Sequence, residues 1–272
     1  GSAGSIPDVT ETGFSQTRYT FSADINRSLD IDVTACDIVI AGTDTDSVIV
    51  DVLENDTYKY KMSTSDNTLV IRDGEAATES ETLNLFGLKI PTGKKRAPSY
   101  TGLAMIIYLP ESFGGKITAI STDGDVKLGN LKLEEELTVT TANGTMTLSD
   151  IEAYDITLTN KGGRVSLTNL SATEITAETT DAKIRAEDLT AKRLTLTTTN
   201  APIDFSRLFG EKFDFGTTNA DISGSILGDE LLFSISTESD KSVYPKSKEN
   251  ERAKYKLTAK TNGGDIDINF VS

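Results

Sequence analysis

Apolar residues recur at a nearly fixed interval from Ile117 to the end of the chain. The successive steps are 20, 19, 19, 19, 19, 19 and 25 residues, so six of seven agree within one residue. Internal similarity at such a period is typical of repeat architectures, in which each repeat stacks on its neighbour. The repeats begin at Ile117, Leu137, Ile156, Ile175, Leu194, Phe213, Leu232 and Leu257.

Aligned on these starts, the repeats share columns of residue type. The position two residues after each start is mostly apolar, and the position four residues after it is Ser, Thr or Asn. The positions nine and eleven residues after the start are again mostly apolar, although Lys241 interrupts the first of them. The position seven residues after the start holds only small residues: Gly124, Gly144, Gly163, Ala182, Ala201, Ala220, Ser239 and Gly264.

These columns predict strands and tight turns. Apolar residues at every second position indicate a strand with one buried face, and the small column indicates a turn with no room for a larger side chain. One repeat cannot bury its apolar face alone, whereas stacked repeats form a continuous core at the strand spacing of about 4.8 Å. The pattern predicts an all-β parallel β-solenoid (β-helix) with rungs of about 19 residues. An antiparallel sandwich would also alternate, but it does not require columns at a fixed period.

The same pattern occurs once upstream, at residues 29–40, where Cys36 occupies the small column. We expect residues 13–110 to form an N-terminal β cap continuous with the solenoid repeats of residues 111–272. Such a cap is needed because the bare end of a solenoid is an unpaired strand edge. Further strands are expected at residues 47–53, 58–64, 68–72 and 104–109, the last of them ended by Pro110.

Three segments depart from the regular pattern. Residues 1–12 read as a tag or leader remnant and linker, and whether a transmembrane anchor or signal peptide was removed from this end stays open. Residues 73–102 form an inserted loop, whose apolar segment 83–90 is expected to pack on the body. Residues 241–256 form a basic loop insertion that we expect to be a solvated surface loop. The final strand, 265–271, is expected to be exposed and able to pair end to end with another chain.

Composition excludes several kinds of chemistry. The 272 residues, expected to form roughly one or two domains, contain no His and one Cys. A Ser–His triad, a His-based metal site, an internal disulfide and a zinc cluster are therefore excluded. The 27 basic and 42 acidic residues give a formal net charge of −15, which opposes binding to nucleic acids and to anionic lipid surfaces.

Cysteine and calcium chemistry are both disfavoured. Cys36 takes the place of a Gly or Ala and has no His to activate it, so we do not expect a reactive thiol. The acidic turns at residues 123–125, 219–221 and 262–265 offer oxygen ligands of the kind that calcium prefers. Thr145, Arg164, Lys183 and Pro202 interrupt that column, however, so no carboxylate ladder forms. We expect no metal and no cofactor.

Two outward patterns remain as candidate sites. Glu134, Glu135, Glu136 and Glu152 could supply the paired carboxylates of a glycosidase, but no long loop beside them predicts a cleft wall, and we assign no catalytic residue. Threonines should project together from one face, as on ice-binding solenoids, although Thr is also common on exposed strands. Interruptions at Glu178, Asp214 and Gly216 favour a general surface for carbohydrate or protein. The threonines are Thr138, Thr140, Thr157, Thr159, Thr176, Thr195 and Thr197.

The repeats at residues 117–131 and 156–170 resemble those of a bacterial putative-adhesin family of unknown function. Residues 29–40 and 106–110 are similar to the N-terminal part of that family, and the resemblance covers residues 24–271. It implies an extracellular, cell-surface or cell-envelope protein of a bacterium, secreted or membrane-anchored, and it carries over no catalytic residue.

Three functions stay open. The favoured one is a non-enzymatic surface or envelope scaffold, an adhesin that binds glycan or protein through a side face or the loops. The alternatives are a polysaccharide-active β-helix enzyme and an envelope-stress sensor or regulatory ectodomain. No nucleic-acid partner is expected, and membrane contact is expected only through an anchor not contained in this sequence. The ligand-binding residues and the oligomeric state stay open.

Overall fold

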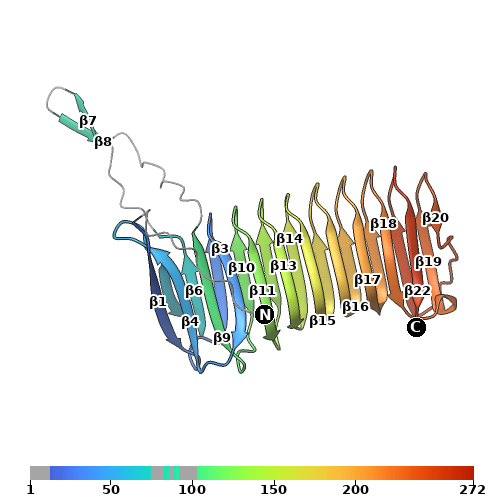
Figure 1. Cartoon of the computed structure of the whole chain (residues 1–272), viewed down its shortest axis with the longest axis horizontal. Coiled ribbons are helices and arrows are strands. Elements are labelled where there is room, and N and C mark those ends of the chain that lie inside the picture. The colour runs from blue at the N-terminus through green and yellow to red at the C-terminus, as the bar shows by residue number, and fades with distance from the viewer. Residues whose placement is uncertain (1–12, 75–81, 86–87, 92–102) are drawn as a thin grey trace.

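The computed structural model describes residues 13–74, 82–85, 88–91 and 103–272. Within these residues the protein is built from strands, twenty of which form one large sheet that is mostly parallel. In the central part of the molecule, successive turns of the chain follow one another along its long axis (Figure 1). The predicted all-β class and the parallel stacking are confirmed. No helix in this described part has both the length and the apolar character needed to cross a membrane.

The N-terminal strands are β1 (Ser15–Ser22), β2 (Ser28–Val33), β3 (Asp37–Thr43), β4 (Ser47–Glu54), β5 (Lys61–Ser65), β6 (Thr68–Arg72), β7 (Thr82–Leu85), β8 (Leu88–Pro91) and β9 (Ala104–Pro110). The stacked strands are β10 (Ile117–Ser121), β11 (Val126–Lys132), β12 (Leu137–Thr141), β13 (Met146–Glu152), β14 (Asp155–Asn160), β15 (Val165–Glu178), β16 (Ile184–Thr197) and β17 (Ile203–Gly216). The C-terminal elements are β18 (Ile222–Leu227), the short 3₁₀ helix η2 (Glu230–Leu232), β19 (Phe233–Glu238), β20 (Val243–Tyr244), β21 (Tyr255–Lys260) and β22 (Ile266–Val271).

The apolar columns lie in register inside the stack. Leu137 lies beside Ile156, Ile156 beside Ile175, and Ile175 beside Leu194. All four side chains are fully buried, as are their neighbours two residues further along each strand. The alternating pattern therefore places one face of each strand in a core shared with the rungs on both sides, as expected for stacked repeats.

The column of Ser, Thr and Asn residues is also buried, and its side chains form hydrogen bonds with the backbone of the tight turns. The Thr179 hydroxyl donates to the carbonyl of Gly163 at 2.8 Å, and the Thr198 hydroxyl donates to that of Ala182 at 2.6 Å. Each bond satisfies a turn carbonyl that would otherwise be buried without a partner. A Cβ added to Gly144 would overlap the carbonyl oxygen of Gly124 in the neighbouring rung, which explains the glycine at this position of the small column.

A second corner, which the sequence analysis did not predict, bends each rung into a third short segment. At this corner, one residue in each of five successive rungs adopts a left-handed conformation with φ between 52° and 56°. The Asn169 side chain donates to the Asp150 carboxylate at 2.8 Å, so this corner also forms a ladder between rungs. Asn and Asp tolerate this conformation better than other non-glycine residues. The corner residues are Asn130, Asp150, Asn169, Asp188 and Arg207.

At the N-terminal end, the rung formed first along the chain is not the outermost one. Strands β2 and β3 pair with β10 and β11 on one side, and with β6 and β9 on the other. Strands β5, β4 and β1 then add in antiparallel fashion, β5 on β6, β4 on β9, and β1 on β4. A bidentate pair between Arg18 and the buried carboxylate of Asp51 ties β1 to β4.

The C-terminal end corrects two predictions. Phe213 lies beside Leu257, and Leu257 lies beside Ile235, so the last repeat along the chain is inserted before the previous one. Ile235 rather than Leu232 occupies the column of repeat starts, and Leu232 is 57% exposed. Likewise Val243, rather than Lys241, lies beside Ile266, which explains the break in the apolar column.

The final strand is therefore not the free edge that the sequence predicted. β22 lies between β18 and β20, with Ile266 beside both Ile222 and Val243. The outermost strands are β19 and β20. The 25-residue step between the last two predicted repeat starts is long enough for the chain to form these outer strands first and then to return as β21 and β22 on their inner side. Lys248, in the basic insertion, exchanges two backbone hydrogen bonds with Ile235 and so covers part of β19.

The inserted segment of residues 73–102 is described only in part. β7 and β8 pair with each other in a separate two-stranded antiparallel sheet. The prediction that segment 83–90 packs on the body concerns side chains outside the part of the chain that the structure describes, and the interpretation of residues 1–12 also lies outside it.

Candidate functional site

A groove with a volume of about 950 Å³ runs along the third segment of successive rungs. Its floor is a column of residues that become smaller toward the C-terminal end: Leu133, Ala153, Ala172, Ala191 and Gly210. Backbones approach closely there, since a Cβ on Gly210 would overlap the carbonyl oxygen of Ala191. Small side chains leave this strip lower than the rows beside it, and the hollow results from that difference in size.

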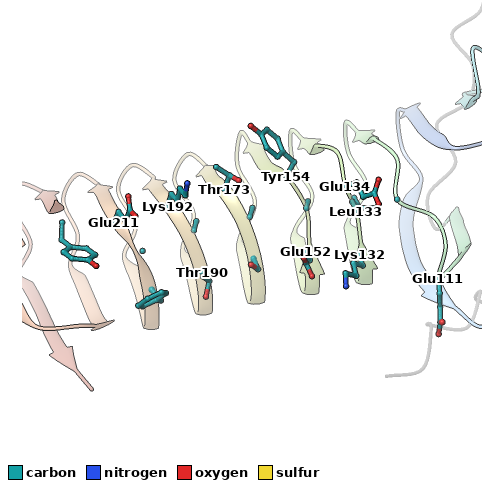
Figure 2. A pocket seen from close by; sticks show the side chains of 18 of the residues that line it. Glu111, Lys132, Leu133, Glu134, Glu152, Tyr154, Thr173, Thr190, Lys192 and Glu211 are labelled. Atoms are coloured by element: carbon teal, nitrogen blue, oxygen red, sulfur yellow. The ribbon is translucent and has the colours of Figure 1, made fainter.

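Two rows of outward side chains flank the floor, with one residue of each row from each rung (Figure 2). One row lies on the strands, where Lys132 is beside Glu152, Glu152 beside Ser171, and Ser171 beside Thr190. The other row lies where the chain turns toward the next rung. It contains Glu134, Tyr154, Thr173, Lys192 and Glu211.

Aromatic side chains stand out from these polar rows. Tyr154 is 57% exposed and Phe209 is 52% exposed, and both line the groove. Tyr255 lines the groove at its C-terminal end and packs against Phe233, with ring centroids 5.3 Å apart. A concave surface with exposed aromatic rings and a few polar groups has the general character of a ligand site.

The charges in the groove are mixed. Its lining includes four acidic and three basic residues: Glu111, Glu134, Glu152, Glu211, Lys132, Lys192 and Lys254. The Lys254 ammonium lies 3.3 Å from the Glu211 carboxylate, which closes the C-terminal end with an ion pair. At the other end, a hollow of about 550 Å³ adjoins the groove and shares Ser112, Gly114 and Glu134 with it.

The structure corrects one prediction about the glutamates. The sequence analysis found no cleft wall beside Glu134 and Glu152, yet both line the groove. The walls come from the side-chain rows of the stack rather than from a loop, so loop length was the wrong criterion. Glu135 lines the adjoining hollow instead, whereas Glu136 lines neither.

The other candidate residues lie elsewhere. Thr138 lies beside Thr157, Thr157 beside Thr176, and Thr176 beside Thr195, so the threonines do form a column on one outward face. The acidic turns hold neighbouring rungs together, since Asp125 accepts from the Thr145 amide and Asp221 from the Asp265 amide. Cys36 is buried, and burial raises the pKa of its thiol to about 12, so it stays protonated at neutral pH.

The floor of the groove, though not the rows that flank it, could have been recognised as a column in the sequence. Its floor lies sixteen residues after the repeat starts, where Ala153, Ala172, Ala191 and Gly210 recur at intervals of 19 residues. The columns that we compared ended eleven residues after each start, so this one was missed. The exposed rows vary too much in residue type to show a pattern by themselves.

The Toastrack DUF4097 family matches residues 26–270 of the chain. No curated protein matches it. One similar solved structure is described as a putative adhesin from Parabacteroides merdae, with 12% identity and a TM-score of 0.42, covering 94% of this chain and 96% of that one. Another, a putative adhesin from Bacteroides fragilis, has 13% identity, a TM-score of 0.41 and coverage of 94% and 97%. A putative cell adhesion protein from Clostridium sporogenes has 9% identity, a TM-score of 0.26 and coverage of 95% and 100%.

Proposed function

The chain belongs to the Toastrack DUF4097 family, and we propose that it is a non-enzymatic scaffold of a bacterial cell surface or envelope that binds an extended glycan. In this proposal the body is a parallel β-solenoid with rungs of about 19 residues, and the ligand lies along the groove of the third segment. The surface location follows the resemblance found in the sequence.

The observation that carries this proposal is the shape and lining of the groove. It extends from Glu111 to Tyr255 and offers equivalent positions rung after rung, at the strand spacing of about 4.8 Å. A regular series of positions suits a linear polymer better than a compact ligand. Exposed aromatic rings such as Tyr154 and Phe209 can stack on the apolar faces of sugar rings, while the flanking charged and hydroxyl groups can hydrogen-bond to sugar hydroxyls.

The test is a glycan and envelope-component binding array on the full chain and on two variants, Tyr154→Ala and Phe209→Ala. We expect saturable glycan binding by the wild type and a loss of roughly tenfold or more in affinity for each variant, because aromatic stacking is lost. Tyr244→Ala is the matched control, since Tyr244 is equally exposed but lies outside the groove. The proposal fails if no glycan binds saturably, or if all three variants weaken binding equally.

A second candidate function, polysaccharide cleavage, is favoured by Glu134 and Glu152 in the groove wall. A pair of carboxylates is what glycoside hydrolysis requires. Depolymerisation should be assayed on every glycan that binds, together with Glu152→Gln. Cleavage by the wild type that Glu152→Gln abolishes without loss of binding would replace the scaffold proposal, whereas binding without cleavage supports the scaffold.

A further inference from the structure

Beside the groove, six consecutive residues of one column change the sign of their charge at the middle of the series. We call this series the charge stripe, and it consists of the residues that immediately precede Leu137, Ile156, Ile175, Leu194, Phe213 and Leu257. In the same column, Lys116 lies beyond the acidic end of the stripe and Ser234 lies beyond its basic end, so the antiparallel arrangement described below places Lys116 opposite the neutral Ser234. Asp155 lies beside Glu174, Glu174 beside Arg193, and Arg193 beside Lys212. Lys212 then lies beside Lys256, and Glu136 immediately precedes the strand that pairs with β14. In spatial order the stripe is Glu136, Asp155, Glu174, Arg193, Lys212 and Lys256.

The six charges of the stripe are available to a partner. Asp155 is half-buried and the other five residues are exposed. Within the described residues, none of the six forms an ion pair or a side-chain hydrogen bond. The neighbouring Lys254 and Glu211 differ, because they pair with each other and are already neutralised.

Three acids followed by three bases form a pattern that is complementary to its own reverse. When a second stripe runs antiparallel to the first, Glu136 faces Lys256, Asp155 faces Lys212, and Glu174 faces Arg193. Every one of the six contacts across the interface is then between opposite charges. A two-fold axis between the rungs of Glu174 and Arg193 generates this arrangement, which is the closed symmetry most common among oligomers.

We propose that the charge stripe is the contact surface for a second copy of this chain, which docks antiparallel as a two-fold dimer. A polyanion would be repelled by the acidic half and a polycation by the basic half. The required partner carries both charges in the opposite order, and the chain itself satisfies this requirement. Although the net charge of −15 repels two copies overall, the stripe holds equal numbers of acids and bases and is locally neutral.

The proposal is independent of glycan binding, because it uses a different row of residues. Tyr154 borders both surfaces, so the variants used here leave it unchanged. All measurements should be made at one fixed ionic strength, since salt screens both the overall repulsion and the local attraction. The readout is the dissociation constant of the dimer, obtained by sedimentation equilibrium on the full chain, with circular dichroism to confirm that each variant is folded.

Two half-reversed variants test the stripe. Asp155→Lys with Glu174→Lys makes the central four positions basic, and Arg193→Glu with Lys212→Glu makes them acidic. Each is expected to raise the Kd of the homodimer by roughly a hundredfold, because like charges then face each other. The first variant also lowers the overall negative charge, so a dimer governed by net charge would become stronger instead. Asp44→Lys with Asp46→Lys is the control, with the same change in net charge on exposed residues outside the stripe.

Recombination of the variants distinguishes the stripe from general surface effects. An equimolar mixture of the two half-reversed variants should form a heterodimer, and the variant with all four substitutions should again form a homodimer close to the wild type. The control should dimerise at least as well as the wild type. A wild type that stays monomeric at the highest concentration reached would overturn the proposal. So would half-reversed variants that dimerise normally, or a mixture that does not associate.

Discussion

The centre and the ends of this molecule are built from the same kind of stacked strands, but the spatial order of the rungs follows the order of the chain only in the centre. From Leu137 to Phe213 each repeat lies beside the next one along the chain. At both ends the chain moves outward, forms the outermost parallel rung, and then returns to an inner position. At the N-terminal end β10 and β11 return to the inner side of β2 and β3, and at the C-terminal end β21 and β22 return to the inner side of β19 and β20. At the N-terminal end the outer rung is formed by β6 and β9, and at the C-terminal end by β19 and β20.

The comparison shows what the period of a repeat can and cannot predict. In the centre the steps are 19 residues, and the connections are too short to reach any rung but the next. At the C-terminal end the reversal of order involves a longer connection, residues 239–254, which includes β20, whereas at the N-terminal end β9 reaches β10 through residues 111–116 and passes the rung of β2 and β3. The entropic cost of a loop rises only slowly with its length, so a long connection allows an order that gives the returning strands two neighbours.

Among these tests, removal of β22 should have the largest effect, because it should destabilise the C-terminal end and leave the centre folded. Truncation after residue 264 takes away the buried Ile266 and Ile268, and it leaves β18 and β20 without the strand between them. Hydrogen exchange is expected to rise strongly in residues 222–227 and 243–244, while β13 to β16 stay protected. If β20 remains as protected as in the full chain, the inserted order of the last two rungs is wrong.

Phe213→Ala should be the most damaging single substitution among those considered. Phe213 is fully buried on β17, the strand that pairs with the inserted strand β21. Its ring packs against those of Phe215 and Phe233. We expect a loss of about 3–5 kcal/mol in the free energy of unfolding, measured by urea denaturation, because a large cavity is left. Phe209→Ala on the same strand is the control. Since Phe209 is exposed, its change should be within about 0.5 kcal/mol, and equal losses for both variants would contradict the assignment.

The buried hydroxyl ladder of the centre should contribute less per residue. Thr198→Val removes the donor to the Ala182 carbonyl and is expected to lower the free energy of unfolding by about 1–3 kcal/mol. Thr195→Val is the control, because Thr195 lies three residues earlier on the outward threonine face. A loss for Thr195→Val as large as that for Thr198→Val would show that the ladder has no special role.

Alkaline pH should affect the N-terminal end before the centre. A hydrogen bond to Glu54 raises the pKa of Tyr19 to about 12, and burial raises that of Tyr58 to about 12 and that of Tyr60 further. The neutral forms are thus favoured by folding. Their contribution to stability is fully present below the unfolded pKa of about 10 and is lost as pH rises toward 12.

A spectrophotometric titration of the tyrosines measures this effect. Part of the absorbance change should occur only near pH 12, together with loss of strand signal. Tyr58→Phe with Tyr60→Phe should remove part of this late step. Completion of the whole absorbance change near pH 10 would contradict the assignment.

Particular residues show how far the sequence could be interpreted. The buried Thr179 and the crowded Gly144 were identifiable because their columns repeat at 19 residues. Lys241 was noticed as an exception but was not recognised as evidence that the repeat start lay elsewhere. In the groove, Glu134 and Glu152 were identified as candidates, while Tyr154 and Phe209 were not. Their rows carry no periodic residue type, because nothing in the core restricts an outward side chain.

The amino-acid sequence by itself determined the strands, the tight turns and the stacking of the central rungs. A strand with one apolar face, repeated at a constant short interval, has a single simple way to bury that face. Only the tertiary structure decided the order of the rungs at the two ends, because that order depends on pairings between strands far apart along the chain, which leave no local pattern. It also decided the groove and the charge stripe, since both are made of residues 19 or more positions apart that become neighbours only when the rungs stack.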